Sequence, residues 1–129
     1  MTRRILIVGD DSDTTYCLKD SLELLGCHVD TERCEAQAVE RIKSREYSAV
    51  ILDIIFPGIR GFNVLRQLHQ DGVKIPVIAL SGHAYQDEVR AEGIHAFLAK
   101  PFALREFERV VERLIPPARG HLGSLSWVI

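Results

Sequence analysis

Residues 48–61 read SAVILDIIFPGIRG and carry an aspartate at the end of an apolar run. Residues 49–52 and Ile54 are apolar, which indicates a strand that is buried on both faces. A carboxylate beside such a strand loses solvation, so Asp53 needs a compensating partner or a function. The groups that meet this carboxylate must come from other parts of the chain.

Apolar runs of strand length alternate with segments of helical period along the whole chain. Strands are predicted at residues 5–8, 28–32, 49–53, 75–81 and 96–101. Helices are predicted at residues 13–26, 35–47, 62–72, 85–93 and 103–115, of which 85–93 has the weakest apolar face. Five such units predict an α/β fold, with a parallel sheet and helices on both of its faces.

Size and charge narrow the function classes. A chain of 129 residues suffices for one domain with one core and is too short for two. The net charge of −2, with acids and bases interspersed, provides no electrostatic footprint for nucleic acid or for an anionic membrane. The longest apolar runs have strand length, so we expect neither a membrane span nor a signal peptide.

The three cysteines are Cys17, Cys27 and Cys34. Their number is odd and their spacings match no zinc-binding pattern. We therefore expect reduced thiols in a cytoplasmic protein. Cys17 and Cys27 are expected to serve as small apolar fillers.

Polar groups stand where several of the predicted strands end. In open parallel sheets, ligands bind beyond the carboxyl ends of the strands. The groups at those ends are Asp10 and Asp11, Asp53, Ser81 and Lys100. Clustered carboxylates favour a cation, and a few oxygen ligands suit Mg²⁺. A lysine and a hydroxyl beside such a site suit transfer of a phosphoryl group to a carboxylate.

Four segments together resemble the receiver domains of response regulators in two-component signalling, over about residues 3–115. The segments read ILIVGDD (5–11), LDIIFPGIRG (52–61), ALSGHA (79–84) and GIHAFLAKPF (93–102). The fold resembles that of the single-domain chemotaxis-type regulators. The resemblance implies a doubly wound, flavodoxin-like, five-stranded parallel sheet of order 2-1-3-4-5.

The same resemblance implies a role for individual residues. Asp53 would be the phosphoacceptor, with Ser81 and Lys100 binding the phosphoryl group. Ser81 and Phe97 would form the switch, and the Lys100–Pro101 bond would be cis. The Mg²⁺ ligands would be Asp10, Asp53 and the backbone carbonyl of Ile55, with Asp11 as a further candidate.

Each of these residues also has a simpler, structural interpretation. Asp53 could be a structural carboxylate paired with Lys100, and Ser81 a strand-end cap. Phe97 could belong to the core, and a helix N-cap is the equal alternative for Asp11. His83 could approach the acyl phosphate, although a solvated loop histidine is favoured.

Position 9 departs from the family pattern, which usually has two acids directly after the first strand. Gly9 takes the first acid position and Asp10 the second. We expect Gly9 to leave a hole where a carboxylate usually holds a metal-bound water, so that Gly9→Asp would bind Mg²⁺ more tightly. Arg60 also stands just before Gly61, where the family often has an acid.

The expected protein is a phosphoacceptor and not an enzyme, with slow autodephosphorylation at most. Its partners would be a histidine kinase or phosphotransfer protein and an unknown downstream protein, without nucleic acid or membrane. Residues 1–116 would form the receiver domain, and residues 117–129 a linker, a docking segment or an artificial remnant. One alternative is a degenerate receiver that works without phosphate. A haloacid-dehalogenase-like phosphatase is disfavoured, because Ile55 stands where its second acid is needed.

Overall fold

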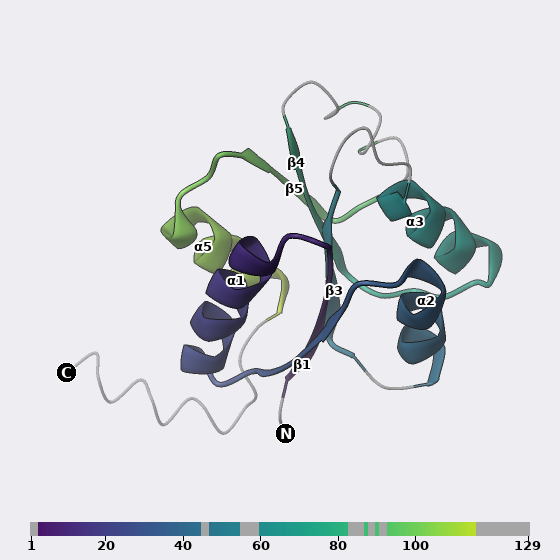
Figure 1. Cartoon of the computed structure of the whole chain (residues 1–129), viewed down its shortest axis with the longest axis horizontal. Helices are drawn as coiled ribbons and strands as arrows, with labels where there is room; N and C mark the ends of the chain where they lie inside the picture. Colours follow the sequence, from purple (N-terminus) through teal and green to yellow (C-terminus); the bar gives the residue numbers. More distant parts are fainter. Residues whose placement is uncertain are drawn as a thin grey trace.

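The computed structural model describes residues 3–44, 47–54, 60–82, 87, 90 and 93–115, with the backbone alone at 60–62. Five parallel strands form one sheet of order β2-β1-β3-β4-β5 (Figure 1). The strands are β1 (Arg4–Val8), β2 (His28–Glu32), β3 (Ala49–Asp53), β4 (Val77–Gly82) and β5 (Ala96–Lys100). The helices are α1 (Ser12–Leu24), α2 (Glu35–Ser44), α3 (Arg60–Gln70) and α5 (Leu104–Leu114).

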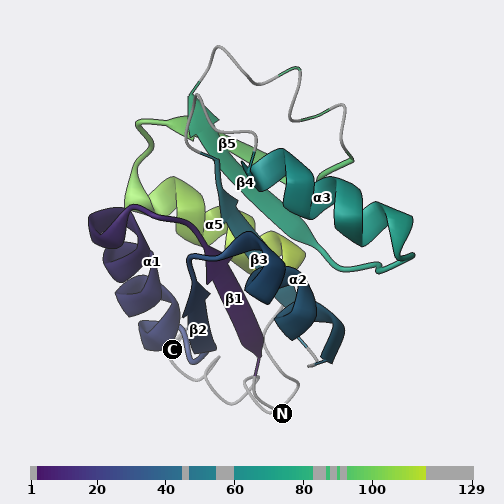
Figure 2. The same ribbon diagram turned by 45° about the vertical axis from the view of Figure 1, so that its right-hand side comes forward.

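The helices cover the sheet from both sides. Helices α1 and α5 lie on one face, and α2 and α3 lie on the other (Figures 1 and 2). Alternate residues of a strand point to opposite faces, so one strand feeds two apolar layers. In β1, Ile5 and Ile7 join the layer under α1 and α5, whereas Leu6 and Val8 join the layer under α2 and α3. Burial on both faces explains why the inner strands read as continuous apolar runs.

The predicted α/β class and strand order are confirmed, and most elements lie within two or three residues of their predicted bounds. Gly26 follows α1 with a φ of 88°, a left-handed conformation that favours glycine and ends the helix as expected. The predicted helix at 85–93 lies largely outside the described residues. Within the described part of the chain, no helix is long and apolar enough to cross a membrane.

The expectation for the cysteines is half correct. Cys27 is buried in the layer under α1 and α5, but Cys17 is exposed on α1 and fills no part of the core. The helical period places Cys17 next to the buried Leu18, on the outer side of the helix. All three cysteines are free thiols.

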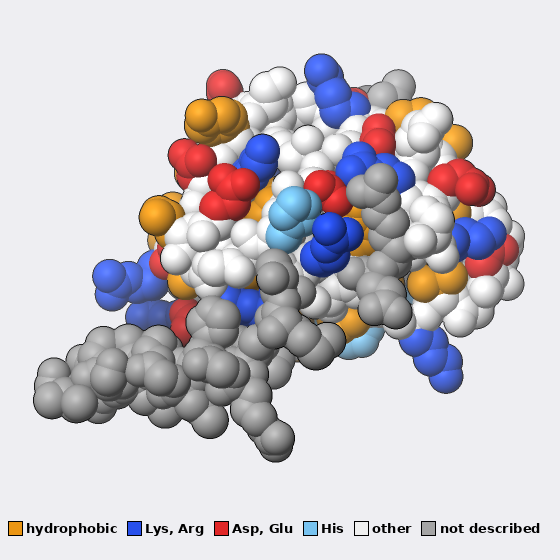
Figure 3. Space-filling model, turned by 90° about the horizontal axis from the view of Figure 1, so that it is seen from below, with side chains coloured by type: hydrophobic (Ala, Val, Ile, Leu, Met, Phe, Trp, Pro, Cys, Tyr) orange, Lys and Arg blue, Asp and Glu red, His pale blue; other side chains and the backbone are white. Residues whose placement is uncertain are grey.

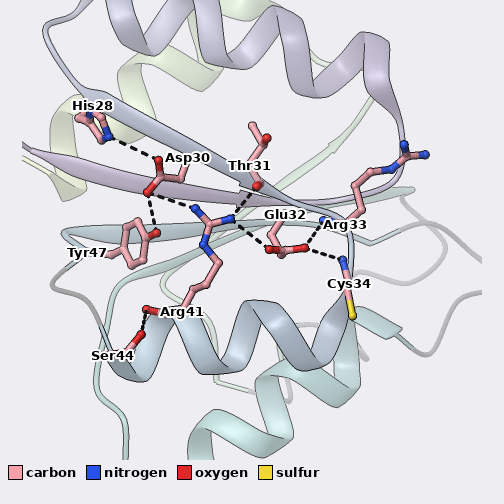
Figure 4. Close-up of polar contacts among 9 residues, drawn as sticks. All are labelled: His28, Asp30, Thr31, Glu32, Arg33, Cys34, Arg41, Ser44 and Tyr47. Carbon is pink, nitrogen blue, oxygen red and sulfur yellow. Dashed lines mark hydrogen bonds and ion pairs between the residues drawn. The ribbon is translucent and has the colours of Figure 1, made fainter.

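Arg41 of α2 ties that helix to the edge strand β2 (Figure 4). Its Nη1 donates hydrogen bonds to the carbonyl oxygen of Thr31 at 2.9 Å and to Oε1 of Glu32 at 3.0 Å. Its Nη2 lies 3.4 Å from Oδ2 of Asp30, which also accepts a 2.7 Å hydrogen bond from the hydroxyl of Tyr47. The guanidinium therefore joins three consecutive residues of the outermost strand.

Burial opposes ionisation of Glu32, but the hydrogen bonds from the Cys34 N–H and from Arg41 outweigh it and lower the pKa of Glu32. A lowered folded-state pKa stabilises the fold above the usual glutamate pKa, and this contribution is lost as pH falls through the folded-state value. The link between α2 and β2 is thus sensitive to acid.

We predict that Arg41→Ala lowers the free energy of unfolding at neutral pH by about 1–3 kcal/mol, because it leaves partly buried carboxylates without their partner. The loss should shrink as pH falls below the usual glutamate pKa, because protonated Glu32 no longer gains from the guanidinium. Urea denaturation at several pH values measures both effects.

Arg33→Ala is the matched control, because the exposed side chain of Arg33 points away from the cluster in Figure 4. This control should change stability by less than about 0.5 kcal/mol. Equal effects of the two substitutions would show that the Arg41 cluster does not stabilise the fold.

Candidate functional site

The carboxylate of Asp53 and the ammonium of Lys100 form an ion pair at the carboxyl edge of the sheet. Lys100 Nζ lies 2.5 Å from Asp53 Oδ1. Asp53 ends β3 and Lys100 ends β5, so the lysine reaches across the end of the intervening strand β4. The aspartate side chain is 1% exposed and the lysine side chain 29%, so the pair is open to solvent from the lysine side.

Burial raises the pKa of Asp53 above its usual value, although the hydrogen bond and positive charge of Lys100 oppose this shift. The negative charges of Asp11 and Asp10 raise it further. Oδ2 of Asp53 is buried and has no hydrogen-bond partner among the described residues. The attraction of one lysine therefore does not offset the free-energy cost that burial and two neighbouring acids impose on the ionised carboxylate.

Ser81 lies beside this pair, at the end of β4. The register of β4 and β5 sets Ser81 opposite Ala99 and Gly82 opposite Lys100. Ser81 is completely buried, and its Oγ lacks a hydrogen-bond partner in the part of the chain that the structure describes. A buried hydroxyl without a partner is costly, so Ser81 retains an unused donor at the edge that carries Asp53.

The two acids after β1 differ in their contacts. Asp11 is the N-cap of α1, and its Oδ1 accepts hydrogen bonds from the backbone N–H groups of Asp13 and Thr14. Its Oδ2 accepts a 2.7 Å bond from the Thr14 hydroxyl, and these bonds from Thr14 lower the pKa of Asp11. Asp11 is thus a helix N-cap, one of the two alternatives from the sequence. The neighbouring Asp10 is exposed.

The side chains of Asp10, Asp11 and Asp53 do not form a complete metal-binding site by themselves. No group of three or more acidic, histidine or cysteine side chains within the described ranges is arranged to hold a metal ion. Asp10 is nonetheless close enough to Asp53 for its charge to raise the pKa of Asp53. A cation at this edge would therefore be coordinated by few carboxylates and by other oxygen atoms.

Gly9 does not leave the hole that we expected from the sequence. An added Cβ at Gly9 would lie 2.8 Å from the Cβ of Asp53, closer than two such atoms approach in folded proteins. The space of the missing side chain is filled by the base of Asp53.

Phe97 lies on β5, half-buried against the apolar layer under α2 and α3. The guanidinium carbon of Arg90 stands 5.7 Å from the centre of its ring, a cation–π distance. The switch role of Phe97 stays a prediction. Arg90 was missed by the sequence analysis, since it precedes Phe97 by seven residues without a recognisable motif.

Several expected site residues lie outside the described part of the chain. These are Ile55, whose carbonyl was expected as a metal ligand, and His83. The side chain of Arg60 is also not described. The Lys100–Pro101 peptide bond is cis, as expected.

The family model of the response regulator receiver domain matches residues 5–112. The chain belongs to this family.

Curated relatives of this receiver domain are longer proteins. It is 35% identical over 125 residues to the transcriptional regulatory protein QseB of Escherichia coli O157:H7, covering 94% of this chain and 57% of that one. It is 36% identical over 110 residues to the response regulator MprA of Mycobacterium ulcerans, covering 82% of this chain and 47% of that one. The chain thus spans about half the length of the curated relatives it matches.

Solved receiver domains match over almost their full length. Response regulator protein TrrA from Thermotoga maritima, solved in complex with Mg²⁺–BeF, is 28% identical with a TM-score of 0.79, covering 88% of this chain and 100% of that one. A receiver domain of a Pseudomonas aeruginosa sensor histidine kinase has a magnesium ion in its active-site cleft. It is 28% identical with a TM-score of 0.77, covering 91% of this chain and 100% of that one.

We predict that Gly9→Ala destabilises the receiver domain by about 1–3 kcal/mol, because the added methyl forces β1 and β3 apart. Chemical denaturation measures the change. Gly82→Ala is the matched control, since a Cβ at this strand-end glycine meets nothing within 4 Å among the described atoms.

The control should stay within about 0.5 kcal/mol of the wild type. A neutral Gly9→Ala would mean that the close approach of Gly9 to Asp53 does not exist in solution.

Proposed function

We propose that this receiver domain accepts a phosphoryl group on Asp53 from a histidine kinase or phosphotransfer protein, with Mg²⁺ bound at the site. One observation carries the proposal: a buried carboxylate that is paired with Lys100 keeps a second oxygen without a partner among the described residues. A structural ion pair does not require such an oxygen, whereas a nucleophile does.

In the proposed reaction, a carboxylate oxygen of Asp53 attacks the phosphorus of a phosphohistidine. The new P–O bond forms as the P–N bond to the imidazole breaks, and the bonding electrons leave with the imidazole nitrogen. Lys100 stabilises the phosphoryl oxygens by its charge, and the Ser81 hydroxyl donates a hydrogen bond to one of them. Lys100 is already paired with Asp53, and Ser81 stands at the end of β4, the strand next to Asp53.

The residues present fit a divalent cation of the Mg²⁺ type. Excess negative charge gathers around Asp53, and its buried oxygen lacks a partner in the described ranges. Asp10 and Asp53 would hold the ion, with the backbone carbonyl of Ile55 as a further ligand. When bound there, Mg²⁺ would neutralise part of the charge on the phosphoryl oxygens. Asp11 is engaged as the α1 cap and would lie outside the ligand set.

Phosphorylation would act through Ser81 and Phe97. A phosphoryl group on Asp53 offers an acceptor to the unused Ser81 hydroxyl, which would draw the end of β4 toward it. Phe97 lies on the adjacent strand and would move inward with this shift, leaving the Arg90 guanidinium. The surface around β5 and α5, which an unknown downstream protein would contact, would then change.

Domain bounds, location and output belong to the proposal. Residues 1–116 would form the receiver domain and residues 117–129 a tail. Free thiols at all three cysteines support a cytoplasmic location. The absence of an acid at Gly9 favours a second candidate, a degenerate receiver that signals through protein contacts without phosphate. Enzymatic activity would not exceed slow autodephosphorylation.

We predict that incubation with acetyl phosphate and Mg²⁺ adds the mass of one phosphoryl group to the wild type and none to Asp53→Asn. Intact-mass spectrometry reads the result directly. Asp71→Asn is the matched control, because Asp71 is an aspartate next to the end of α3, paired with Lys43 on the surface.

The control should gain the same mass as the wild type. Equal modification of Asp53→Asn would refute the phosphoacceptor assignment, and no modification of the folded wild type would favour the degenerate receiver.

We also predict that Mg²⁺ stabilises the wild type by about 2.7 kcal/mol when its concentration is 100 times the dissociation constant. Asp10→Asn and Asp53→Asn should lose most of this gain, since each removes a proposed ligand. Asp11→Asn should keep it, because asparagine still caps α1. Thermal unfolding with and without Mg²⁺ measures the effect.

Without Mg²⁺, Asp53→Asn should be more stable than the wild type at neutral pH. The raised pKa of Asp53 means that its ionised form disfavours the fold, and this cost appears as pH rises from the unfolded-state to the folded-state value. Mg²⁺ stabilisation that is identical in all three variants would place the ion elsewhere.

A further inference from the structure

Phe97 lies between an apolar layer of the core and a surface cation. Its half-buried ring packs against the layer under α2 and α3. The guanidinium of the exposed Arg90 stands over the ring, with its central carbon 5.7 Å from the ring centre. A cation in this place is attracted by the negative face of the ring. The contact therefore favours the position in which Phe97 stands in this structure.

Burial acts on the same ring in the opposite direction. Phenylalanine has no hydroxyl group to keep in water, so a half-exposed ring gains free energy when it moves further into the core. Such a movement would take the ring away from the guanidinium of Arg90, which is exposed. The position of Phe97 is thus set by two opposed interactions, of which one depends on Arg90.

The neighbours of Phe97 on its face of the sheet are small. The register places Ala79 beside Phe97 and Ser81 beside Ala99. Alternate residues of a strand share a face, so all four side chains lie on the face that α2 and α3 cover. Side chains of this size do not block a movement of the ring toward Ser81, whose Oγ has no hydrogen-bond partner among the described residues.

We propose that the contact between Arg90 and Phe97 is autoinhibitory: it holds Phe97 in its phosphate-free position and so opposes activation. This inference rests on the proposed switch role of Phe97 and adds Arg90 as the residue that regulates it. Phosphorylation of Asp53 would have to break the contact. A change that weakens the contact should therefore strengthen the binding of a phosphoryl group, or of a mimic of it, by the same factor.

Fluorine NMR follows the ring itself in the absence of phosphate. The chain has five phenylalanines, so labelling with 4-fluorophenylalanine and comparison with Phe97→Leu identify the Phe97 resonance. In the phosphate-free protein, Arg90→Gln should move this resonance toward the position that the wild type shows with Mg²⁺ and beryllofluoride, a mimic of the phosphoryl group. Arg90→Lys keeps a cation, so its resonance should stay closer to that of the wild type. Arg90 is exposed, so both variants should keep the fold, which far-UV circular dichroism checks.

The affinity for the mimic provides the second measurement. At saturating Mg²⁺, Arg90→Gln should bind beryllofluoride about two- to fivefold more tightly than the wild type, the factor that corresponds to an exposed cation–π contact. Arg33→Gln is the matched control, because it removes the same charge next to β2, at the opposite edge of the sheet from β5. Figure 3 shows basic and acidic side chains intermixed at one end of the molecule, without a broad field of one sign that the loss of one arginine would disrupt. The control should therefore bind beryllofluoride like the wild type.

The outcomes separate this inference from the proposed function. A Phe97 resonance that Arg90→Gln leaves unchanged, or moves away from its position in the mimic-bound wild type, would overturn the inference. A wild type that binds beryllofluoride as tightly as Arg90→Gln does would also overturn it. A folded wild type that binds no beryllofluoride would refute the proposed phosphate switch, and the autoinhibitory role with it, whatever the resonance shows.

Discussion

Ionisation of Asp53 inside the edge of the sheet is the constraint on which the site depends. Lys100 comes from β5 and reaches over the end of β4, so its charge reaches Asp53 only while the registers of β3 with β4 and of β4 with β5 are kept. Ser81 is carried between them by the same register. The continuous apolar strands serve this arrangement, because their burial on both faces holds the strand ends in fixed positions. Fold and site are thus two results of one register.

Most of the fold could be predicted from the sequence. Strands buried on both faces read as unbroken apolar runs, and the alternation with helical segments determines a parallel sheet. The strand-end residues Asp53, Ser81 and Lys100 followed from this topology, and the structure brings them together at one edge. The roles proposed for them came from the resemblance to receiver domains, and the family match covers residues 5–112.

The remaining features depend on distances that no sequence pattern specifies. A glycine after a strand suggests open space, yet Gly9 is where β1 meets the side chain of Asp53. The Asp11-x-x-Thr14 spacing of a helix cap was a readable signal, and it distinguishes Asp11 from Asp10. The sequence analysis assigned no role to Arg41, although its contacts reach three residues of β2. Helical period alone does not specify which neighbour a long side chain finds.

The contact between Gly9 and Asp53 also limits how this lineage can change. A single substitution cannot place an acid at position 9 at little cost, because its Cβ would collide with the side chain of Asp53. Strand β1 would have to move away from β3 first, through changes in the layers that pack against both strands. Positions 9 and 53 are therefore coupled through space, so a change of residue at one of them alters which side chains the other can accept.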